Sequence, residues 1–144
     1  MESNRMTEEW RTIKGFDNYE VSNKGNVRNT KTHRQLKIAY QPSGYAIVSL
    51  RANGKTRTSA VNRLVMNAFN PIEDNQNTRY DVVHMDNDKR NNELSNLKWM
   101  THTDNILRYA TPNEIEKLNS MIYASVKSTI INWYTDIKNK SNQS

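Results

Sequence analysis

The segment from Val82 to Trp99, VVHMDNDKRNNELSNLKW, restricts the fold more than any other part of the chain. It begins with an apolar run that ends on His84, passes through acidic, basic and asparagine residues, and closes on a second apolar run. Two apolar runs around a short polar stretch are typical of two strands joined by a loop. Alternation along the first strand places Val82 and His84 on one face and Val83 on the other. The sequence therefore predicts a rigid strand end that presents one histidine beside a polar loop.

A β-rich part precedes this segment, from about Trp10 to Asn62. We expect short strands at Tyr19–Val21 and Asn26–Arg28, on either side of an Asn-Lys-Gly turn. The chain then alternates apolar and polar residues around Asn53-Gly54, a dipeptide that favours a two-residue type I′ hairpin turn because both residues tolerate positive φ. The polar face of this hairpin is expected to carry Arg51, Lys55, Arg57 and Thr58. This face either binds phosphate or is an ordinary solvated surface.

Helical patterns flank the strands around His84. Leu64, Val65 and Phe69 follow a helical spacing. Strands are expected from Tyr80 to about Met85 and over LKWMT, residues 97–101. A further helix is expected in THTDNILRYA, residues 101–110, with Thr101 or Thr103 as its N-cap. The predicted order is helix, strand, loop, strand, helix.

A long helix is expected at the end of the chain. Thr111-Pro112-Asn113-Glu114 has the pattern of a capping box with proline at the first helical position. Apolar residues then recur at steps of three or four: Ile115, Leu118, Ile122, Val126, Ile130, Trp133 and Ile137. This predicts one amphipathic helix that ends near Lys138. It either packs against the rest of the chain or serves as a dimer or partner helix.

The composition limits the classes of function. A formal net charge of +6 fits a polyanionic partner, because Lys and Arg displace the counterions of phosphates, but many basic proteins bind nothing acidic. The absence of cysteine excludes thiolate metal sites, cysteine nucleophiles and disulfides. The sequence shows no apolar leader and no apolar run long enough to span a bilayer. We therefore expect a soluble, intracellular protein.

The surroundings of His84 favour a chemical role over the structural role that a single histidine most often has. A strand end and the start of the following helix can lie together, which would place His84 and Asn105 across a small cleft. A neutral imidazole is suited to taking a proton from water near neutral pH. An adjacent divalent ion would stabilise the charge that develops when a phosphodiester is hydrolysed.

Two parts of the chain resemble a known family. NRLVMNAF and VVHMDNDKRNNELSNLKWMTHTDN resemble the HNH endonuclease motif, in the variety common among phage and intron homing endonucleases. The upstream EEWRTIKGFDNYEVSNKGNVRN resembles the small β module that often precedes this motif. The matched motif positions are Arg63, Leu64, Val65, Ala68, Phe69, His84, Asp86, Asn91, Asn92, Asn96, Leu97, Trp99, Thr101 and Asn105.

The resemblance implies a ββα-metal fold and metal-dependent hydrolysis of double-stranded DNA. His84 would be the general base, and Asn96 would tie the loop together and hold that base by hydrogen bonds. Asn105 would be a ligand of the divalent metal, Mg²⁺ or alternatively Mn²⁺. The expected DNA contacts are Lys89 and Arg90 in the loop, together with Arg51, Lys55, Arg57 and Arg63.

Val83 departs from the family pattern. The family usually has Asp, Asn or His directly before the general base, where that residue helps to hold the metal. Valine cannot bind a cation, and Mg²⁺ usually takes at least one carboxylate ligand. Asp81, Asp86 and His102 are the alternative ligands. If none of them replaces the missing group, the chain has kept DNA binding and lost cleavage.

We therefore predict an α+β protein in three parts. An antiparallel β module, residues 9–61, contacts DNA; an HNH-like ββα core, residues 62–110, cleaves it; and a helix, residues 111–138, packs or forms a homodimer. The predicted function is that of an HNH-type, homing-endonuclease-like DNA endonuclease. The alternatives are a catalytically weakened relative that binds DNA and an assembly protein that dimerises. Encoded by a phage or virus, such a protein would act in the host cytoplasm or nucleoid.

Overall fold

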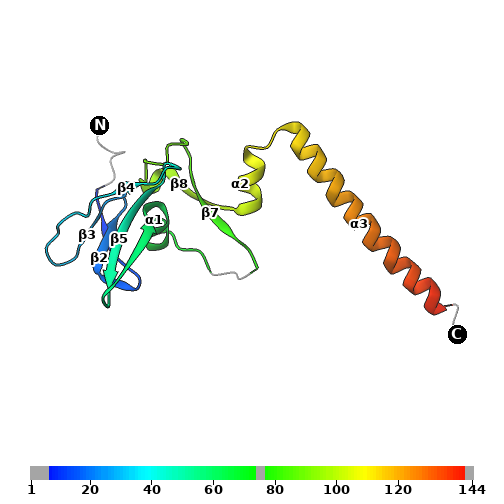
Figure 1. Cartoon of the computed structure of the whole chain (residues 1–144), viewed down its shortest axis with the longest axis horizontal. Helices are drawn as coiled ribbons and strands as arrows, with labels where there is room; N and C mark the ends of the chain where they lie inside the picture. The colour runs from blue at the N-terminus through cyan, green and yellow to red at the C-terminus, as the bar shows by residue number, and fades with distance from the viewer. Residues whose placement is uncertain (1–6, 74–76, 142–144) are drawn as a thin grey trace. The chain divides into compact units, whose positions relative to one another are not determined.

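The computed structural model describes residues 7–73 and 77–141 and has the predicted α+β architecture. The chain divides into two compact units, with the boundary after His102. The first unit holds the eight strands formed by the described residues and the helix α1 (Val61–Phe69) (Figure 1). The second holds nearly all of α2 (His102–Arg108) and the whole of α3 (Pro112–Ser141).

The first sheet is antiparallel and has the order β1-β2-β3. Its strands are β1 (Trp10–Ile13), β2 (Phe16–Ser22) and β3 (Val27–Asn29). The predicted pair of strands around the Asn-Lys-Gly turn is confirmed, and β2 is longer than the sequence pattern indicated. Gly25 in that turn has a φ of +87°, a conformation that glycine adopts without steric cost.

The second sheet has the order β4-β5-β6, with β4 (Ala39–Tyr40), β5 (Ala46–Ala52) and β6 (Lys55–Ala60). The type I′ turn is confirmed, because Asn53 and Gly54 have φ values of 54° and 74° and join the paired residues Ala52 and Lys55. β6 leads directly into α1 without a side-chain cap.

A two-stranded ribbon completes the first unit. β7 (Tyr80–His84) pairs antiparallel with β8 (Leu97–Thr101), and the 3₁₀ turn η1 (Leu94–Asn96) lies directly before β8. Both strands were predicted at these positions. In the register of the ribbon His84 pairs with Leu97, whereas Val83 pairs with Lys98.

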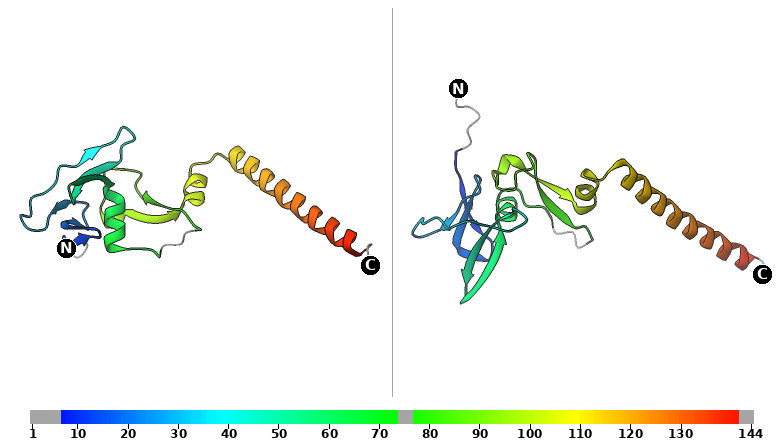
Figure 2. Two further views of the ribbon diagram at one scale, coloured as in Figure 1. Left: turned by 60° about the horizontal axis from the view of Figure 1, so that its bottom comes forward. Right: turned by 45° about the horizontal axis from the view of Figure 1, so that its top comes forward.

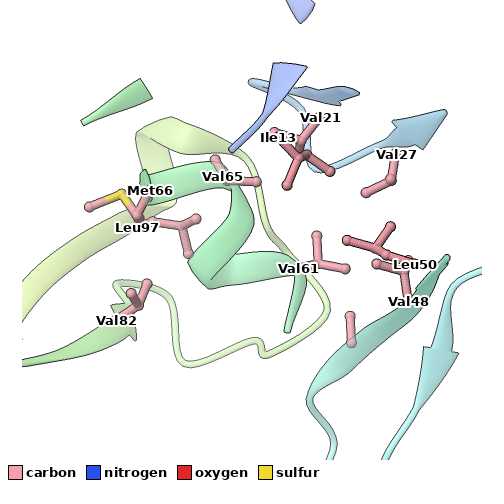
Figure 3. Close-up of a cluster of buried hydrophobic side chains, with 11 residues drawn as sticks. Ile13, Val21, Val27, Val48, Leu50, Val61, Val65, Met66, Val82 and Leu97 are labelled. Atoms are coloured by element: carbon pink, nitrogen blue, oxygen red, sulfur yellow. The ribbon is translucent and has the colours of Figure 1, made fainter. Parts of the chain in front are cut away.

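One hydrophobic core joins the three β elements through α1. Figure 2 shows α1 against the strands on both of its sides, and it contacts strands of all three sheets. In Figure 3 its side chains Val61 and Val65 point toward the two three-stranded sheets, while Met66 lies beside Leu97 of β8. Fully burying such a side chain contributes about 1.5–3 kcal/mol. The β module and the ribbon are therefore stabilised by the same helix.

The second unit contains the predicted long helix. The capping box that begins α3 is formed, because the backbone N–H of Glu114 donates to Oγ1 of Thr111 at 3.2 Å and the N–H of Thr111 donates to Oε2 of Glu114 at 3.3 Å. Large apolar side chains along α3 are exposed: Leu118, Met121, Ile122, Tyr123, Val126, Ile130, Ile131, Trp133, Tyr134 and Ile137. No helix in the described part of the chain has the length and apolar character needed to cross a membrane.

Candidate active site

His84 ends β7 and is fixed from several sides. Only 5% of the residue is exposed. Its ring centroid lies 6.2 Å from that of Tyr45, the residue before β5. Its Nε2 lies 2.8 Å from Oδ1 of Asn92 in the loop between β7 and η1. The strand and the loop therefore both fix the position of the imidazole ring.

The contact with Asn92 selects one tautomer of the ring. The amide nitrogen of Asn92 faces the carbonyl oxygen of Lys89 at 3.5 Å, which directs the amide oxygen toward His84. An amide oxygen only accepts hydrogen bonds, so in the neutral ring Nε2 carries the proton. Nδ1 then keeps its lone pair and is the nitrogen that can accept a proton.

Asn96 ties the loop together. Its Nδ2 donates to Oδ1 of Asp86 and to the carbonyl oxygen of Asn91, both at 2.9 Å, and its Oδ1 accepts from the backbone N–H of Asp86 at 3.0 Å. Its own carbonyl oxygen accepts from the N–H of Met85 at 2.8 Å. Asn96 is 8% exposed, whereas Asp86 is exposed, so these bonds lie at the boundary between the interior and solvent.

Asp86 accepts hydrogen bonds from three groups of the loop. The side chain of Asn91, the backbone N–H of Asp88 and the side chain of Asn96 all donate to its carboxylate, and they hold the pKa of Asp86 below its usual value. Asn87 follows with a φ of 63°, which asparagine tolerates better than most residues. The carboxylate thus stabilises a tight turn directly after His84.

The structure corrects the expected partner of His84. Sequence analysis predicted that Asn96 ties the loop together and also holds the base. Asn96 bonds Asp86 and Asn91, whereas the side chain against the imidazole is that of Asn92. Two asparagines therefore divide the tasks, since one bonds the loop and the other bonds the ring.

The two basic residues of the loop stack on aromatic rings of the β module. Nζ of Lys89 lies 4.4 Å from the ring centroid of Tyr45 and donates to the carbonyl oxygen of Ser43 at 2.7 Å. The guanidinium of Arg90 lies 4.1 Å from the ring centroid of Tyr40. Both cations therefore attach the loop to the β module. Their role in DNA binding, which the sequence predicted, remains a prediction.

The basic residues of the β5–β6 hairpin do not share one face, contrary to the expectation from sequence. Directly paired residues of an antiparallel ladder lie on the same face. Arg51 pairs with Thr56, whereas Arg57 pairs with Leu50, whose side chain is buried in the core. Because side chains alternate along β6, Lys55 lies with Arg57, and Thr58 lies on the face of Arg51.

Asp81, one of the alternative metal ligands, is contacted by His102, another of them, and by Arg63, the last of the predicted DNA-binding residues. Nδ1 of His102 lies 2.7 Å from Oδ2 of Asp81, and the guanidinium groups of Arg63 and Arg79 lie 3.9 Å and 3.8 Å from its Oδ1. Arg63 also donates to the carbonyl oxygen of Tyr80 at 3.1 Å. Asp81 is thus already surrounded by cationic or hydrogen-bonding side chains.

Few of the usual metal-binding side chains lie together in the described part of the chain. Among residues 7–73 and 77–141, no group of three or more His, Cys, Asp or Glu side chains is placed to hold a metal ion. Val83 is apolar and buried. Asn105 lies on α2 in the second unit, and its role as a ligand remains a prediction. A hard cation would take most of its oxygen ligands from water and substrate phosphate.

Sequence reasoning did not assign a role to Asn92 or to its neighbours in the β module. Asn92 was matched as a motif position, but its spacing from His84 does not reveal which asparagine reaches the ring. Gly25 and Asn23 contact the loop from the β module, but their sequence pattern predicted only a turn. Their contribution depends on packing between segments that are far apart in the sequence.

Two family models match the chain. Residues 8–51 match the NUMOD4 motif, and residues 59–107 match the HNH endonuclease model. The second match includes His84, Asn96 and Asn105.

Several viral proteins are similar to the chain. An uncharacterized HNH endonuclease, L245, of Acanthamoeba polyphaga mimivirus is 38% identical over 78% of this chain and 33% of its own length. DNA endonuclease I-HmuI of Bacillus phage SP01 is 32% identical over 83% of this chain and 68% of its own length. The chain thus spans about two thirds of the phage protein and one third of the mimivirus protein.

A solved structure has the same fold. It is described as DNA binding and cleavage by the HNH homing endonuclease I-HmuI, and it superposes with a TM-score of 0.63 at 31% identity. The match covers 78% of this chain and 66% of that one.

Proposed function

The chain belongs to the HNH endonuclease family, and from this we propose that it hydrolyses phosphodiester bonds of double-stranded DNA with His84 as general base. The observation that carries the proposal is the hydrogen bond between Nε2 of His84 and the amide oxygen of Asn92. This bond leaves Nδ1 as the proton acceptor on a ring that a strand end holds in place. A general base needs both properties, a free lone pair and a fixed position.

In the proposed reaction Nδ1 of His84 removes a proton from a water molecule. The water oxygen attacks the phosphorus, one phosphorus–oxygen bond of the DNA backbone breaks, and the departing oxygen takes up a proton from solvent water. As Nδ1 gains its proton the ring becomes an imidazolium, and the Nε2–H···Oδ1 bond to Asn92 strengthens because its donor is now charged. Asn92 therefore stabilises the state in which the base holds the proton.

HNH endonucleases in general depend on divalent metal, and we propose Mg²⁺ for this chain, with Mn²⁺ as the alternative. When bound, the ion would stabilise the charge on the phosphate oxygens. Asn105 is the proposed protein ligand. Since the described chain brings few oxygen ligands, DNA and water would complete the shell of the ion.

We propose that DNA contacts the basic residues around the loop and those on one face of the hairpin, either Arg51 or the pair Lys55 and Arg57. The net charge of +6 supports this proposal, as does the exposure of the hairpin side chains Arg51, Lys55 and Arg57. Arg63 of α1, and Lys89 and Arg90 of the loop, would contribute while keeping their contacts with Tyr80, Ser43 and Tyr40. Binding of this kind weakens steeply with salt.

A second candidate function is DNA binding with weakened cleavage. The observation in its favour is Val83, a buried apolar side chain at the position where the family usually has a polar residue. In this case the basic surface is intact, but the ion has too few protein ligands to act.

A supercoiled-plasmid assay tests the two candidates. Purified protein is incubated with Mg²⁺, Mn²⁺ or EDTA, and His84→Ala is compared with His33→Asn. The control removes another histidine, and asparagine tolerates the φ of 57° at that exposed position. Metal-dependent nicking that is lost in His84→Ala and kept in His33→Asn supports the nuclease. A salt-sensitive gel shift without cleavage supports the second candidate, and cleavage by His84→Ala at the wild-type rate contradicts the role of His84.

A further inference from the structure

The turn between β2 and β3, residues 22–26, packs directly on the loop that holds His84. A Cβ atom placed on Gly25 would lie 2.9 Å from both Cβ and the carbonyl oxygen of Asn92. Separations of this size are shorter than van der Waals contact, so no larger residue fits unless Asn92 moves. Asn92 is the residue whose amide bonds Nε2 of His84. Only one residue, Asn92, therefore separates the turn of the β module from the proposed general base.

A backbone hydrogen bond fixes the other side of the same contact. The N–H of Leu94 donates to the carbonyl oxygen of Asn23 at 2.8 Å. Asn23 is 4% exposed, and its side chain accepts from the N–H of Glu9 and donates to the carbonyl oxygen of Thr7, both at 3.0 Å. The turn is thus fastened to the segment before β1 as well as to the loop.

The turn is also rigid in itself. The hydroxyl of Ser22 donates to Oε2 of Glu8 at 2.8 Å and accepts from the backbone N–H groups of Lys24 and Asn26 at 3.2 Å and 3.1 Å. The side chain of Asn26 donates to the same carboxylate oxygen at 2.7 Å. Ser22 has no exposed surface. A turn with this many internal bonds can act as a fixed support.

We infer that residues 22–26 of the β module are a positioning element of the proposed active site, with Gly25 as its contact point. The turn sets the position of Asn92, and Asn92 sets the tautomer and orientation of His84. The β module is therefore needed for the proton-accepting state of the base, in addition to any contact that it makes with DNA. This inference rests on the proposed function for its catalytic meaning, while the link from Gly25 to the ring can be measured without cleavage.

The test compares Gly25→Ala with Gly15→Ala. The two glycines have nearly the same φ, +87° and +85°, so a methyl group brings the same backbone strain at both. At Gly15 an added Cβ meets no atom within 4 Å, whereas at Gly25 it meets Asn92. The difference between the variants thus isolates the contact with the loop.

The first readout is the tautomer of His84, taken from the ¹⁵N shifts of its imidazole. We expect one dominant form, protonated at Nε2, in the wild type and in Gly15→Ala, and a mixture of the two neutral forms in Gly25→Ala. The second readout is cleavage of plasmid DNA, for which we expect a loss of at least about tenfold in kcat for Gly25→Ala, with DNA affinity within about twofold of wild type. An unchanged His84 spectrum in a folded Gly25→Ala protein overturns the inference.

Asn92→Leu keeps the test decisive if Gly25→Ala does not fold. Leucine has a similar size but offers no acceptor, so the turn stays intact while the ring loses its partner. We expect the same mixture of tautomers, and the wild-type spectrum in this variant would overturn the inference. If the wild type does not cleave under any condition but its ring is held in the Nε2–H form, the nuclease proposal fails and the positioning contact stands.

Discussion

Replacing Asn96 with alanine tests whether this side chain is the main support of the loop. The substitution removes three hydrogen bonds, two to Asp86 and one to the carbonyl oxygen of Asn91. A hydrogen bond within a protein contributes about 0.5–1.5 kcal/mol net, so the sum is about 1.5–4.5 kcal/mol. Asp86 is exposed, and water replaces part of what it loses. We expect the free energy of unfolding of the first unit to fall by about 2 kcal/mol.

Urea denaturation with a matched control measures this loss. Asn91→Ala removes the bond from Nδ2 of Asn91 to Oδ2 of Asp86, 2.9 Å long, and a longer one of 3.4 Å that its Oδ1 accepts from the N–H of Glu93. The cost should be about 1 kcal/mol, because the longer bond is weak. Hydrogen exchange gives a local readout, because the amide of Asp86 donates to Asn96 and should exchange faster in Asn96→Ala. A loss for Asn96→Ala that equals or falls below that for Asn91→Ala would refute the reasoning, since Asn96 would then not be the principal tie of the loop.

Three further predictions concern metal, salt and acid. Val83→Asp should lower the Mg²⁺ concentration for half-maximal plasmid cleavage by about tenfold, because it adds an oxygen ligand; an unchanged requirement would mean that another group already serves. Arg51 and Arg57 lie on opposite faces of the hairpin, so only one of them should contact DNA. One of the variants Arg51→Gln and Arg57→Gln should therefore reduce the slope of log binding constant against log salt concentration by about one, and the other should leave it unchanged. Equal effects would place both faces on DNA. The lowered pKa of Asp86 predicts that its contribution to loop stability is complete above about pH 4 and is lost as the pH falls through that lowered value. Hydrogen exchange of the loop amides, measured from about pH 5 down to about pH 2, would detect this loss, and protection that stays constant over that range would contradict it.

The elements that sequence reasoning predicted are those specified by local signals. Asn53-Gly54 fixes a type I′ turn through the φ values of two residues, and Thr111 and Glu114 form their capping box within one turn of helix. The strand that ends at His84 was identified from its apolar run and the polar loop that follows it. In each case the atoms that decide the structure lie within a few residues of one another.

The hairpin faces show how a local signal was misread. A two-residue turn pairs Ala52 with Lys55, and this register already places Arg51 and Thr56 on the same face of the hairpin. Grouping the residues by charge overlooked the two-residue period of the strand. The correct faces therefore followed from the sequence, once the turn type was combined with strand pairing.

The assignment of Asn92 could not have followed from the sequence in the same way. The loop contains several asparagines, and which of them reaches the ring depends on how the loop is folded over the turn that contains Gly25. That turn and the loop are more than sixty positions apart, and their contact arises only when α1 brings the β module and the ribbon onto one core. Long-range packing of this kind leaves no periodic trace in either segment.

The pleat of β7 separates the two requirements of the proposed reaction. His84 and Val83 are neighbours in the strand, so their side chains point to opposite faces, His84 beside Leu97 and Val83 beside Lys98. On the face of His84 the chain supplies a fixed proton acceptor through Asn92. On the other face Val83 offers no ligand, and Asp81, the carboxylate two residues earlier on that face, already contacts His102 and two arginines. Within the described chain no cluster of three or more His, Cys, Asp or Glu side chains compensates. An ion that obtains most of its oxygen ligands from DNA and water would bind weakly to the free protein. Binding of the ion should therefore be much tighter when DNA is present.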